Sequence, residues 1–207
     1  MGQRLNIEIK KKETNETIAN CYYHWSAYTK SALDLTLEII ENTISVNYNE
    51  KEVDKMYAIR LLESTGAGVI SDEYDLLTEK EQRVCRVGEN RNLGLISFTE
   101  KGIEETRKWE EGRVEIYLPN ITDYFEQIKE IRVSFDVFYR QDIESTKEDY
   151  AEYNIDYDNL IEFDFDLWNM TRENLYELFN RVIEIENNYC GMFKIKGDKE
   201  NIYHCIY

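Results

Sequence analysis

The stretch LNIEIKKKETNETIANCYYHWSAYTKSALDLTLEIIENTI, residues 5–44, decides the fold because its hydrophobic period changes along its length. Its first five residues alternate between apolar and polar side chains, which predicts a β-strand. A polar turn at 13–16 and an aromatic segment at 18–28 predict a second strand, so the chain opens with a β-hairpin. From Ser31 the apolar residues recur every three or four positions, which predicts a helix with Ser31 as its N-cap.

The same periodicities continue along the rest of the chain. Alternating residues at 131–139 and 161–167 predict further strands, and Thr99 is a candidate cap for a short charged helix. A helix at 171–187 and a closing hairpin at 189–207 complete the prediction. The sequence therefore predicts an α+β fold with a mostly antiparallel sheet, packed helices, and β-hairpins at the N-terminal and C-terminal ends.

Length and composition predict a folded protein. The 207 residues are 42% hydrophobic and 13% aromatic, which is enough to build a core. We expect a single domain over residues 1–207, or a boundary near 140–150 that divides off an acidic C-terminal part. No apolar run reaches the roughly 20 residues of a membrane helix, no signal peptide is evident, and the four cysteines form no CxxC pair. These features predict a cytoplasmic protein with no membrane partner.

The net charge of -17 is the strongest functional signal, because so acidic a surface repels nucleic acid as a direct partner. Residues 142–166 hold ten acidic residues and one basic residue, a net charge of -9, with tyrosines among them. Such a face can imitate the charge pattern of DNA and bind a basic groove; the alternative is that the charge serves only solubility. The predicted partner-binding residues are Asp149, Glu152, Tyr153, Asp156, Tyr157, Asp158, Glu162, Asp164 and Asp166.

Part of this acidic stretch is a candidate metal site. Glu162, Asp164 and Asp166 line one face of a predicted strand, roughly 6.6 Å apart per two-residue step. A row of this kind binds Mg²⁺ or Ca²⁺ only when other elements complete the oxygen shell. The chain has neither an EF-hand spacing nor an HExxH motif. A solvated strand face is the favoured interpretation, and we expect no metal and no other cofactor.

A second candidate site lies near the N-terminal sheet. On a continuous strand, His24 and Ser26 would share one face and Cys21 would lie on the other. Catalysis would need a third group to orient the base, so packing of an aromatic strand is favoured over a catalytic role. The loop at 87–96 is either a plain turn or a loop that presents Arg91 to an anion. Together, His24, Ser26 and Arg91 predict an alternative function as a small-molecule (nucleotide-signal) binding protein or a hydrolase.

Four segments resemble a family of small proteins from phages and prophages of Gram-positive bacteria. They are MGQRLNIEI at 1–9, YYHWSAYT at 22–29, NRNLGLIS at 90–97 and EETRKWEEGRV at 104–114. The resemblance covers roughly the first 120 residues and implies a genomic setting within a host bacterial cell. It implies no particular reaction.

The charge and the phage setting together lead to the main functional prediction. The protein is expected to inhibit a host defence protein that has a basic surface and binds nucleic acid, as anti-CRISPR proteins and DNA mimics do. No catalytic residue is assigned under this prediction. The oligomeric state is left open.

Overall fold

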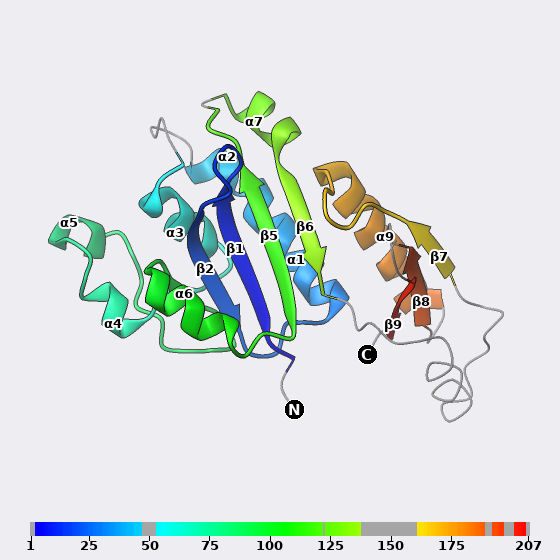
Figure 1. Ribbon diagram of the computed structural model, residues 1–207, viewed down its shortest axis with the longest axis horizontal. Coiled ribbons are helices and arrows are strands. Elements are labelled where there is room, and N and C mark those ends of the chain that lie inside the picture. Colours follow the sequence, from blue (N-terminus) through cyan, green and yellow to red (C-terminus); the bar gives the residue numbers. More distant parts are fainter. Residues whose placement is uncertain are drawn as a thin grey trace.

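The strand β1 (Leu5–Lys11) lies inside a six-stranded sheet in the computed structural model of this chain, with the order β3-β4-β2-β1-β5-β6 (Figure 1). The structure describes residues 3–46, 53–121, 123–137, 161–188, 192–196 and 201–205. The other strands of this sheet are β2 (Thr17–Tyr23), β3 (Gly68–Val69), β4 (Leu95–Ser97), β5 (Gly112–Leu118) and β6 (Arg132–Asp136). Strands β1 and β2 form the predicted N-terminal hairpin.

The α+β fold is confirmed, but the six-stranded sheet is mixed. Three of its pairings are antiparallel, whereas β1 with β5 and β3 with β4 are parallel. Since β4 and β1 are both antiparallel to β2, β4 runs in the same direction as β5. Strands that run in the same direction need a crossover between them. The helix α6 (Glu100–Arg107) provides it between β4 and β5.

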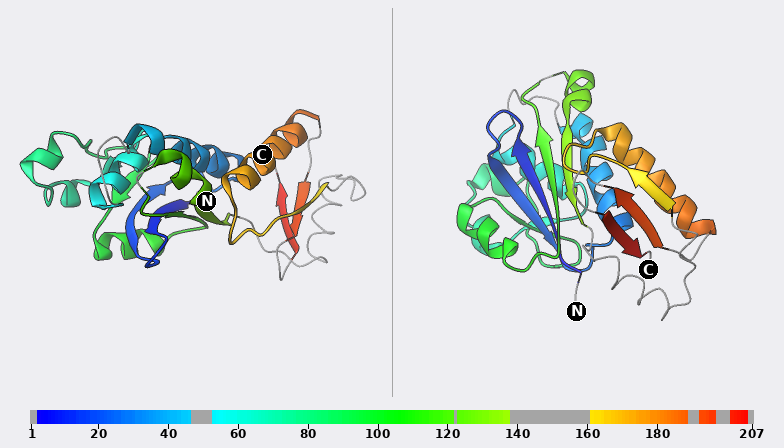
Figure 2. Two further views of the ribbon diagram at one scale, coloured as in Figure 1. Left: turned by 90° about the horizontal axis from the view of Figure 1, so that it is seen from above. Right: turned by 45° about the vertical axis from the view of Figure 1, so that its right-hand side comes forward.

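Helices cover both faces of the six-stranded sheet (Figure 2). The helices α1 and α3 lie on one face, and α6 lies on the other, over β2 and β1 (Figure 1). The part of that second face formed by β5 and β6 is not covered by α6. Besides α6, the structure has the helices α1 (Thr29–Glu41), α2 (Thr43–Val46), α3 (Lys55–Glu63), α4 (Ser71–Tyr74), α5 (Glu79–Gln82), α7 (Tyr124–Glu130) and α9 (Arg172–Asn188) among the described residues.

Both faces of β1 are buried, although its sequence alternates between apolar and polar residues. Leu5, Ile7 and Ile9 are fully buried in the hydrophobic core. Asn6 and Glu8, on the opposite face, are also fully buried and lie beneath α6. A buried polar group destabilises the fold unless it is hydrogen-bonded, so these two side chains need partners on α6.

Glu8 finds its partner in Arg107, at the end of α6. The Arg107 guanidinium donates two hydrogen bonds, both 2.6 Å long, to the two carboxylate oxygens of Glu8. The Thr17 hydroxyl donates a third, 3.0 Å long. The Glu8 carboxylate holds the pKa of Arg107 above its usual value, chiefly through these hydrogen bonds. This bidentate pair therefore fixes α6 across the first hairpin.

The C-terminal part of the chain forms a three-stranded sheet beside the first. It consists of β7 (Ile161–Asp164), β8 (Met192–Lys196) and β9 (Asn201–Cys205), in the order β7-β8-β9. The antiparallel pairing of β8 with β9 confirms the predicted C-terminal hairpin. Near β7, Phe163 and Phe165 are buried and Asp164 and Asp166 are exposed, as the alternation predicts.

The segment between β7 and α9 joins the two parts of the fold. Met170 and Val133 exchange two backbone hydrogen bonds, 2.8 and 2.9 Å long. The Phe135 amide donates a third, 2.7 Å long, to the Leu167 carbonyl. These bonds satisfy the outer edge of β6, and α9 packs on α1 from the same side (Figures 1 and 2).

Two local predictions around the first helix were wrong. The aromatic strand ends at Tyr23, and the helix α1 already begins at Thr29. Its N-cap is Tyr28, which makes no side-chain capping bond, so Ser31 lies within the first turn. The prediction at Thr99 is confirmed, because its hydroxyl accepts a hydrogen bond from the Gly102 amide at the start of α6.

No helix among residues 3–46, 53–121, 123–137 and 161–188 combines the length and apolar character that crossing a bilayer requires.

We expect Arg107→Ala to lower the free energy of unfolding by about 3 kcal/mol, because it removes both short charged hydrogen bonds to the buried Glu8 carboxylate and leaves it, as a charged partner, only the guanidinium of Arg113, 3.9 Å away. The matched control is Arg83→Ala, which removes an arginine from an exposed pair with Glu79 at 3.9 Å and should cost less than about 0.5 kcal/mol. Urea unfolding followed by circular dichroism measures both. Equal stability of the two variants would contradict the role given to the Glu8–Arg107 pair.

Candidate functional site

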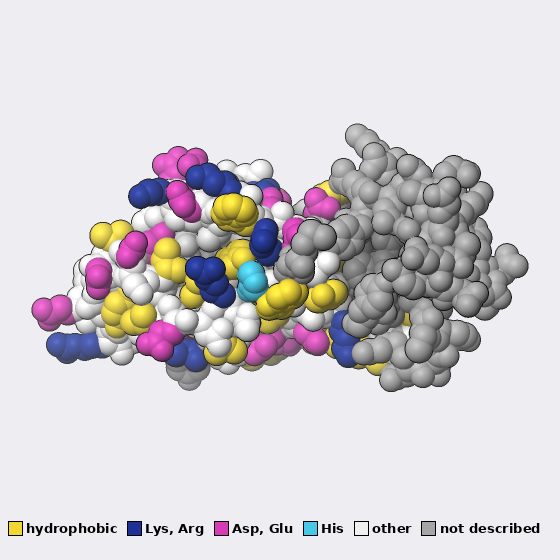
Figure 3. Space-filling model, turned by 90° about the horizontal axis from the view of Figure 1, so that it is seen from below, with side chains coloured by type: hydrophobic (Ala, Val, Ile, Leu, Met, Phe, Trp, Pro, Cys, Tyr) yellow, Lys and Arg dark blue, Asp and Glu magenta, His cyan; other side chains and the backbone are white. Residues whose placement is uncertain are grey.

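A pocket of about 300 Å³ lies where β2 ends, between the loop that follows Gly88 and the end of α6. It is called the arginine pocket here because Arg4 and Arg91 both line it. The lining also includes the aromatic side chains of Tyr22, His24 and Trp109 and the polar side chains of Glu105 and Thr106. Figure 3 shows the face that carries the described histidine, with basic and hydrophobic side chains gathered beside it.

The end of β2 positions the ring of His24. The His24 amide donates a hydrogen bond to the Arg91 carbonyl at 3.0 Å, which joins the end of the strand to the loop. The Tyr22 hydroxyl lies 3.0 Å from Nδ1 of His24. The Trp25 ring meets the His24 ring edge-on, with 5.2 Å between the centroids. The imidazole is therefore held in one orientation by contacts on both sides.

The loop that carries Arg91 is built by its asparagine and glycine residues. The Asn90 side chain accepts a hydrogen bond from the Asn92 amide at 2.9 Å, which forms a tight turn with Arg91 at its tip. Gly94 has a φ of +105°, and a Cβ there would lie 2.7 Å from Sγ of Cys21. Only glycine permits this close approach to β2, so Gly94 brings Arg91 to the pocket.

Arg4 and Trp109 form the opposite wall of the arginine pocket. Arg4 precedes β1, and its carbonyl accepts hydrogen bonds from the Glu111 and Gly112 amides at 2.8 and 3.1 Å. Its guanidinium carbon lies 5.6 Å from the centroid of the Trp109 ring, which is the geometry of a cation–π contact. The Trp109 side chain follows α6 and is 62% exposed. The outer face of this wall is therefore open to a ligand.

The arginine pocket is a cationic site in an acidic protein. Among the described residues, no carboxylate forms an ion pair with the guanidinium of Arg4 or of Arg91. Glu105 is the one acidic residue among those that line the pocket, and it lies 3.5 Å from the ammonium of Lys108. The two guanidinium groups are thus available to an anion from outside, while the chain as a whole carries -17.

The structure places two of the three predicted small-molecule residues in one pocket. His24 and Arg91 both line it, whereas Ser26 is not among the lining residues. Because β2 ends at Tyr23, the strand alternation that would have paired His24 with Ser26 stops before it reaches them. Arg4 and Trp109 were missed, since they lie far from His24 in the sequence. The sequence offered one signal for Trp109, because a tryptophan that directly follows a charged helix is a candidate surface residue for binding.

Two candidate nucleophiles near His24, the thiol of Cys21 and the hydroxyl of Thr106, are not free to react. Cys21 is fully buried, and burial raises the pKa of its thiol to about 12, so it stays neutral. The hydroxyl of Thr106, which does line the pocket, is engaged with the Ile103 carbonyl and the Asn20 side-chain amide. Neither group is placed to attack a substrate with His24 as its base.

The predicted acidic surface lies only in part within the described residues. Asp149, Glu152, Tyr153, Asp156, Tyr157 and Asp158 fall outside them. Glu162 belongs to β7, and the side chains of Asp164 and Asp166 are exposed. Within the part of the chain that the structure describes, no group of three His, Cys, Asp or Glu side chains is placed to hold a metal ion.

Comparison with known proteins gives no match, whether to a family model, a curated protein or a solved structure. The geometry of the arginine pocket is therefore the main basis for a functional assignment.

The raised pKa of Cys21 gives a chemical prediction. At pH 8 a thiol with a pKa of about 12 is ionised to about one part in ten thousand, and the thiolate is the reactive form. We expect iodoacetamide to modify Cys21 at least about a hundredfold more slowly in the native protein than in the urea-unfolded chain. The half-buried Cys85, with a pKa raised to about 11, should react before Cys21. Peptide mapping by mass spectrometry measures both, and rapid native modification of Cys21 would restore it as a candidate nucleophile.

Proposed function

We propose that this protein binds a small anionic ligand with an aromatic ring, of the nucleotide class, in the arginine pocket. The observation that carries the proposal is that Arg4 and Arg91 line the same pocket as Tyr22, His24 and Trp109, without an ionic partner among the described residues. Guanidinium groups bind phosphate through two parallel hydrogen bonds, and aromatic rings stack on nucleobases. The pocket offers both kinds of contact.

The size and charge of the pocket favour a mononucleotide over larger or simpler anions. A volume of about 300 Å³ lies at the lower end of the range for ligand sites. Glu105 repels an anion that fills the whole pocket, but its carboxylate can accept a hydrogen bond from a ribose hydroxyl or a base amino group. This combination favours a ligand with one anionic end and one uncharged, hydrogen-bonding end.

Binding is favoured over catalysis because the arginine pocket combines cationic and aromatic recognition groups, while Cys21 is buried and the Thr106 hydroxyl is already hydrogen-bonded. The contacts of the His24 ring and the Arg4–Trp109 contact limit the conformations of these side chains before a ligand enters. Less conformational entropy is therefore lost on binding. In the phage setting that the sequence resemblance implies, a protein of this kind would sequester a nucleotide signal from a host defence system.

Isothermal titration calorimetry with AMP, GMP, ATP, adenosine and inorganic phosphate tests the proposal. At least one nucleotide should bind more tightly than both phosphate and adenosine, because only a nucleotide engages the guanidinium and aromatic surfaces together. Arg91→Ala should weaken that binding by about 10- to 100-fold, the value of a hydrogen bond to a charged group.

The matched control is Arg83→Ala, which removes one exposed positive charge outside the pocket and should leave the affinity unchanged. If no nucleotide in the panel binds more tightly than phosphate, or if Arg91→Ala binds as the parent chain does, the assignment fails.

We also propose a second function, in which the acidic C-terminal region binds a basic, nucleic-acid-binding host protein and inhibits it. The observation that favours it is the exposure of Asp164 and Asp166 on the segment whose Phe163 and Phe165 side chains are buried. The buried aromatic side chains anchor the segment, so its carboxylates have a fixed direction. Opposite charges on a partner would be attracted over about 10 Å at ordinary salt.

Asp164→Asn with Asp166→Asn should weaken capture of such a partner and make the remaining capture less sensitive to salt, because part of the attraction that salt screens is gone. The control pair Asp72→Asn with Asp75→Asn makes the same change in net charge at exposed positions around α4. The captured protein must also lose bound DNA when the parent chain is added. Equal capture by both double variants would show that the total charge, and not this segment, attracts the partner.

A further inference from the structure

The two walls of the arginine pocket repeat one combination of groups. On one wall, the guanidinium carbon of Arg4 lies 5.6 Å from the centroid of the Trp109 ring. On the other wall, the loop that carries Arg91 is joined to His24 by the hydrogen bond from the His24 amide to the Arg91 carbonyl. The Trp25 ring stands at right angles to the His24 ring, with 5.2 Å between the centroids. Each wall therefore has one arginine and one tryptophan.

Trp25 extends the aromatic surface of the second wall beyond the pocket. It is not among the residues that line the cavity of about 300 Å³, but its neighbour His24 is. Trp25 is 48% exposed, so its contact with His24 leaves much of the ring open. Figure 3 shows basic and hydrophobic side chains together around the described histidine. The Trp25 ring is thus a surface on which a second flat group can stack, just outside the pocket.

The core does not account for the positions of these two tryptophans. Among the described residues, neither Trp25 nor Trp109 belongs to the hydrophobic core or to the partly buried side chains that pack against it. Both remain largely exposed, at 48% and 62%. Large apolar side chains gathered on one exposed face are typical of a binding surface. This observation points to a ligand independently of the charge in the pocket.

The number of free guanidinium groups also exceeds what one phosphate needs. Arg4 and Arg91 both lack an ion-pair partner among the described residues. A guanidinium binds a phosphate through two parallel hydrogen bonds, so two phosphates use both groups in full. A nucleoside monophosphate offers one phosphate and one base, which matches one wall of the pocket.

We propose that the ligand is a dinucleotide, and that Trp25 and Arg91 bind its second half. This inference rests on the nucleotide binding proposed above and names the class of nucleotide. The first nucleotide fills the pocket, where its phosphate contacts Arg4 and its base contacts Trp109. The phosphodiester that follows contacts Arg91, and the second base stacks on the exposed Trp25 ring. Proteins commonly bind unstacked bases on separate aromatic side chains in this way.

Neither a nucleoside triphosphate nor a longer strand fits the two walls as well. A triphosphate adds phosphates but has only one base, so it leaves the Trp25 ring bare. A longer strand adds phosphates that lie outside the two arginines, where the net charge of -17 repels them. Two bases and two phosphates are therefore the favoured composition.

Isothermal titration calorimetry of the full chain tests this with matched pairs of ligands. Adenosine 3′,5′-bisphosphate (pAp) is compared with the dinucleotide pApA, and pGp is compared with pGpG. Each bisphosphate has both phosphates and no second base, so charge alone does not favour the dinucleotide. In at least one series the dinucleotide should bind about tenfold more tightly than the bisphosphate, which is the effect of one stacked base.

Variants at Trp25 assign this difference to its ring. Trp25→Phe keeps an aromatic ring and should keep most of the difference. Trp25→Leu keeps an apolar side chain without a ring, so the dinucleotide and the bisphosphate should then bind with nearly equal affinity. The matched control is Phe125→Leu, which removes a 68% exposed ring from α7, at the opposite end of the sheet (Figure 1), and should leave the difference unchanged. The thermal midpoint of each variant shows that it is folded.

The remaining outcomes overturn the inference in distinguishable ways. If AMP or GMP binds but neither dinucleotide binds more tightly than its bisphosphate, the second half-site is wrong and the proposed function stands. If folded Trp25→Leu keeps the difference, Trp25 does not bind the second base. If pApApApA binds about tenfold more tightly than pApA, the ligand is a longer strand. If no nucleotide binds, the proposed function fails and this inference fails with it.

Discussion

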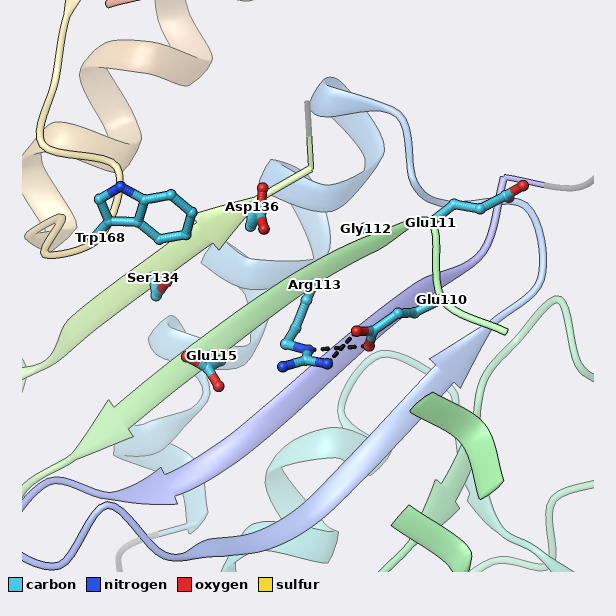
Figure 4. Close-up of a pocket in the computed structure, with 8 residues that line it drawn as sticks. All are labelled: Glu110, Glu111, Gly112, Arg113, Glu115, Ser134, Asp136 and Trp168. Atoms are coloured by element: carbon cyan, nitrogen blue, oxygen red, sulfur yellow. Dashed lines mark hydrogen bonds and ion pairs between the residues drawn. The ribbon is translucent and has the colours of Figure 1, made fainter. Parts of the chain in front are cut away.

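The structure depends on one buried ion pair, between Glu8 on the central strand β1 and Arg107 at the end of α6. A fully buried carboxylate in the middle of a sheet is unfavourable without an opposite charge, so α6 has to cross β1 and β2 at this point. The same constraint sets what α6 does not cover, because a helix fixed over the first hairpin cannot reach β5 and β6. The arginine pocket lies beyond its C-terminal end, and a hollow of about 450 Å³, bordered by Trp168, lies on the open face over β5 and β6 (Figure 4).

The two cavities separate charge within a strongly acidic chain. Arg4 and Arg91 lie at one end of the sheet face without carboxylate partners among the described residues, whereas carboxylates outnumber guanidinium groups over β5 and β6. The His24 ring is held in place by the Tyr22 hydroxyl, so the arginine pocket needs no large rearrangement at this wall to receive the proposed ligand.

The local elements were largely predictable, and the sites were not. The alternation of Leu5, Ile7 and Ile9 correctly predicts β1, and the Thr99 cap correctly predicts α6, because both signals lie within a few residues. The parallel pairing of Leu5 with Gly112 joins residues far apart in the sequence, and no local period reports it. For the same reason the sequence does not show that Glu8, at a polar position of this alternation, is buried by β5 and α6. Arg91 and His24 stood out by residue type, but Arg4 and Trp109 are brought to the arginine pocket only by the fold, because they lie far from His24 in the sequence.

The most direct test of the nucleotide-binding account is nuclear magnetic resonance of the three tryptophan indole N–H signals during titration with a mononucleotide. The account predicts that the Trp109 signal shifts and saturates, together with the ring signals of His24, while the Trp168 signal stays in place. A Trp109 signal that does not move, or a shift confined to Trp168, would contradict it.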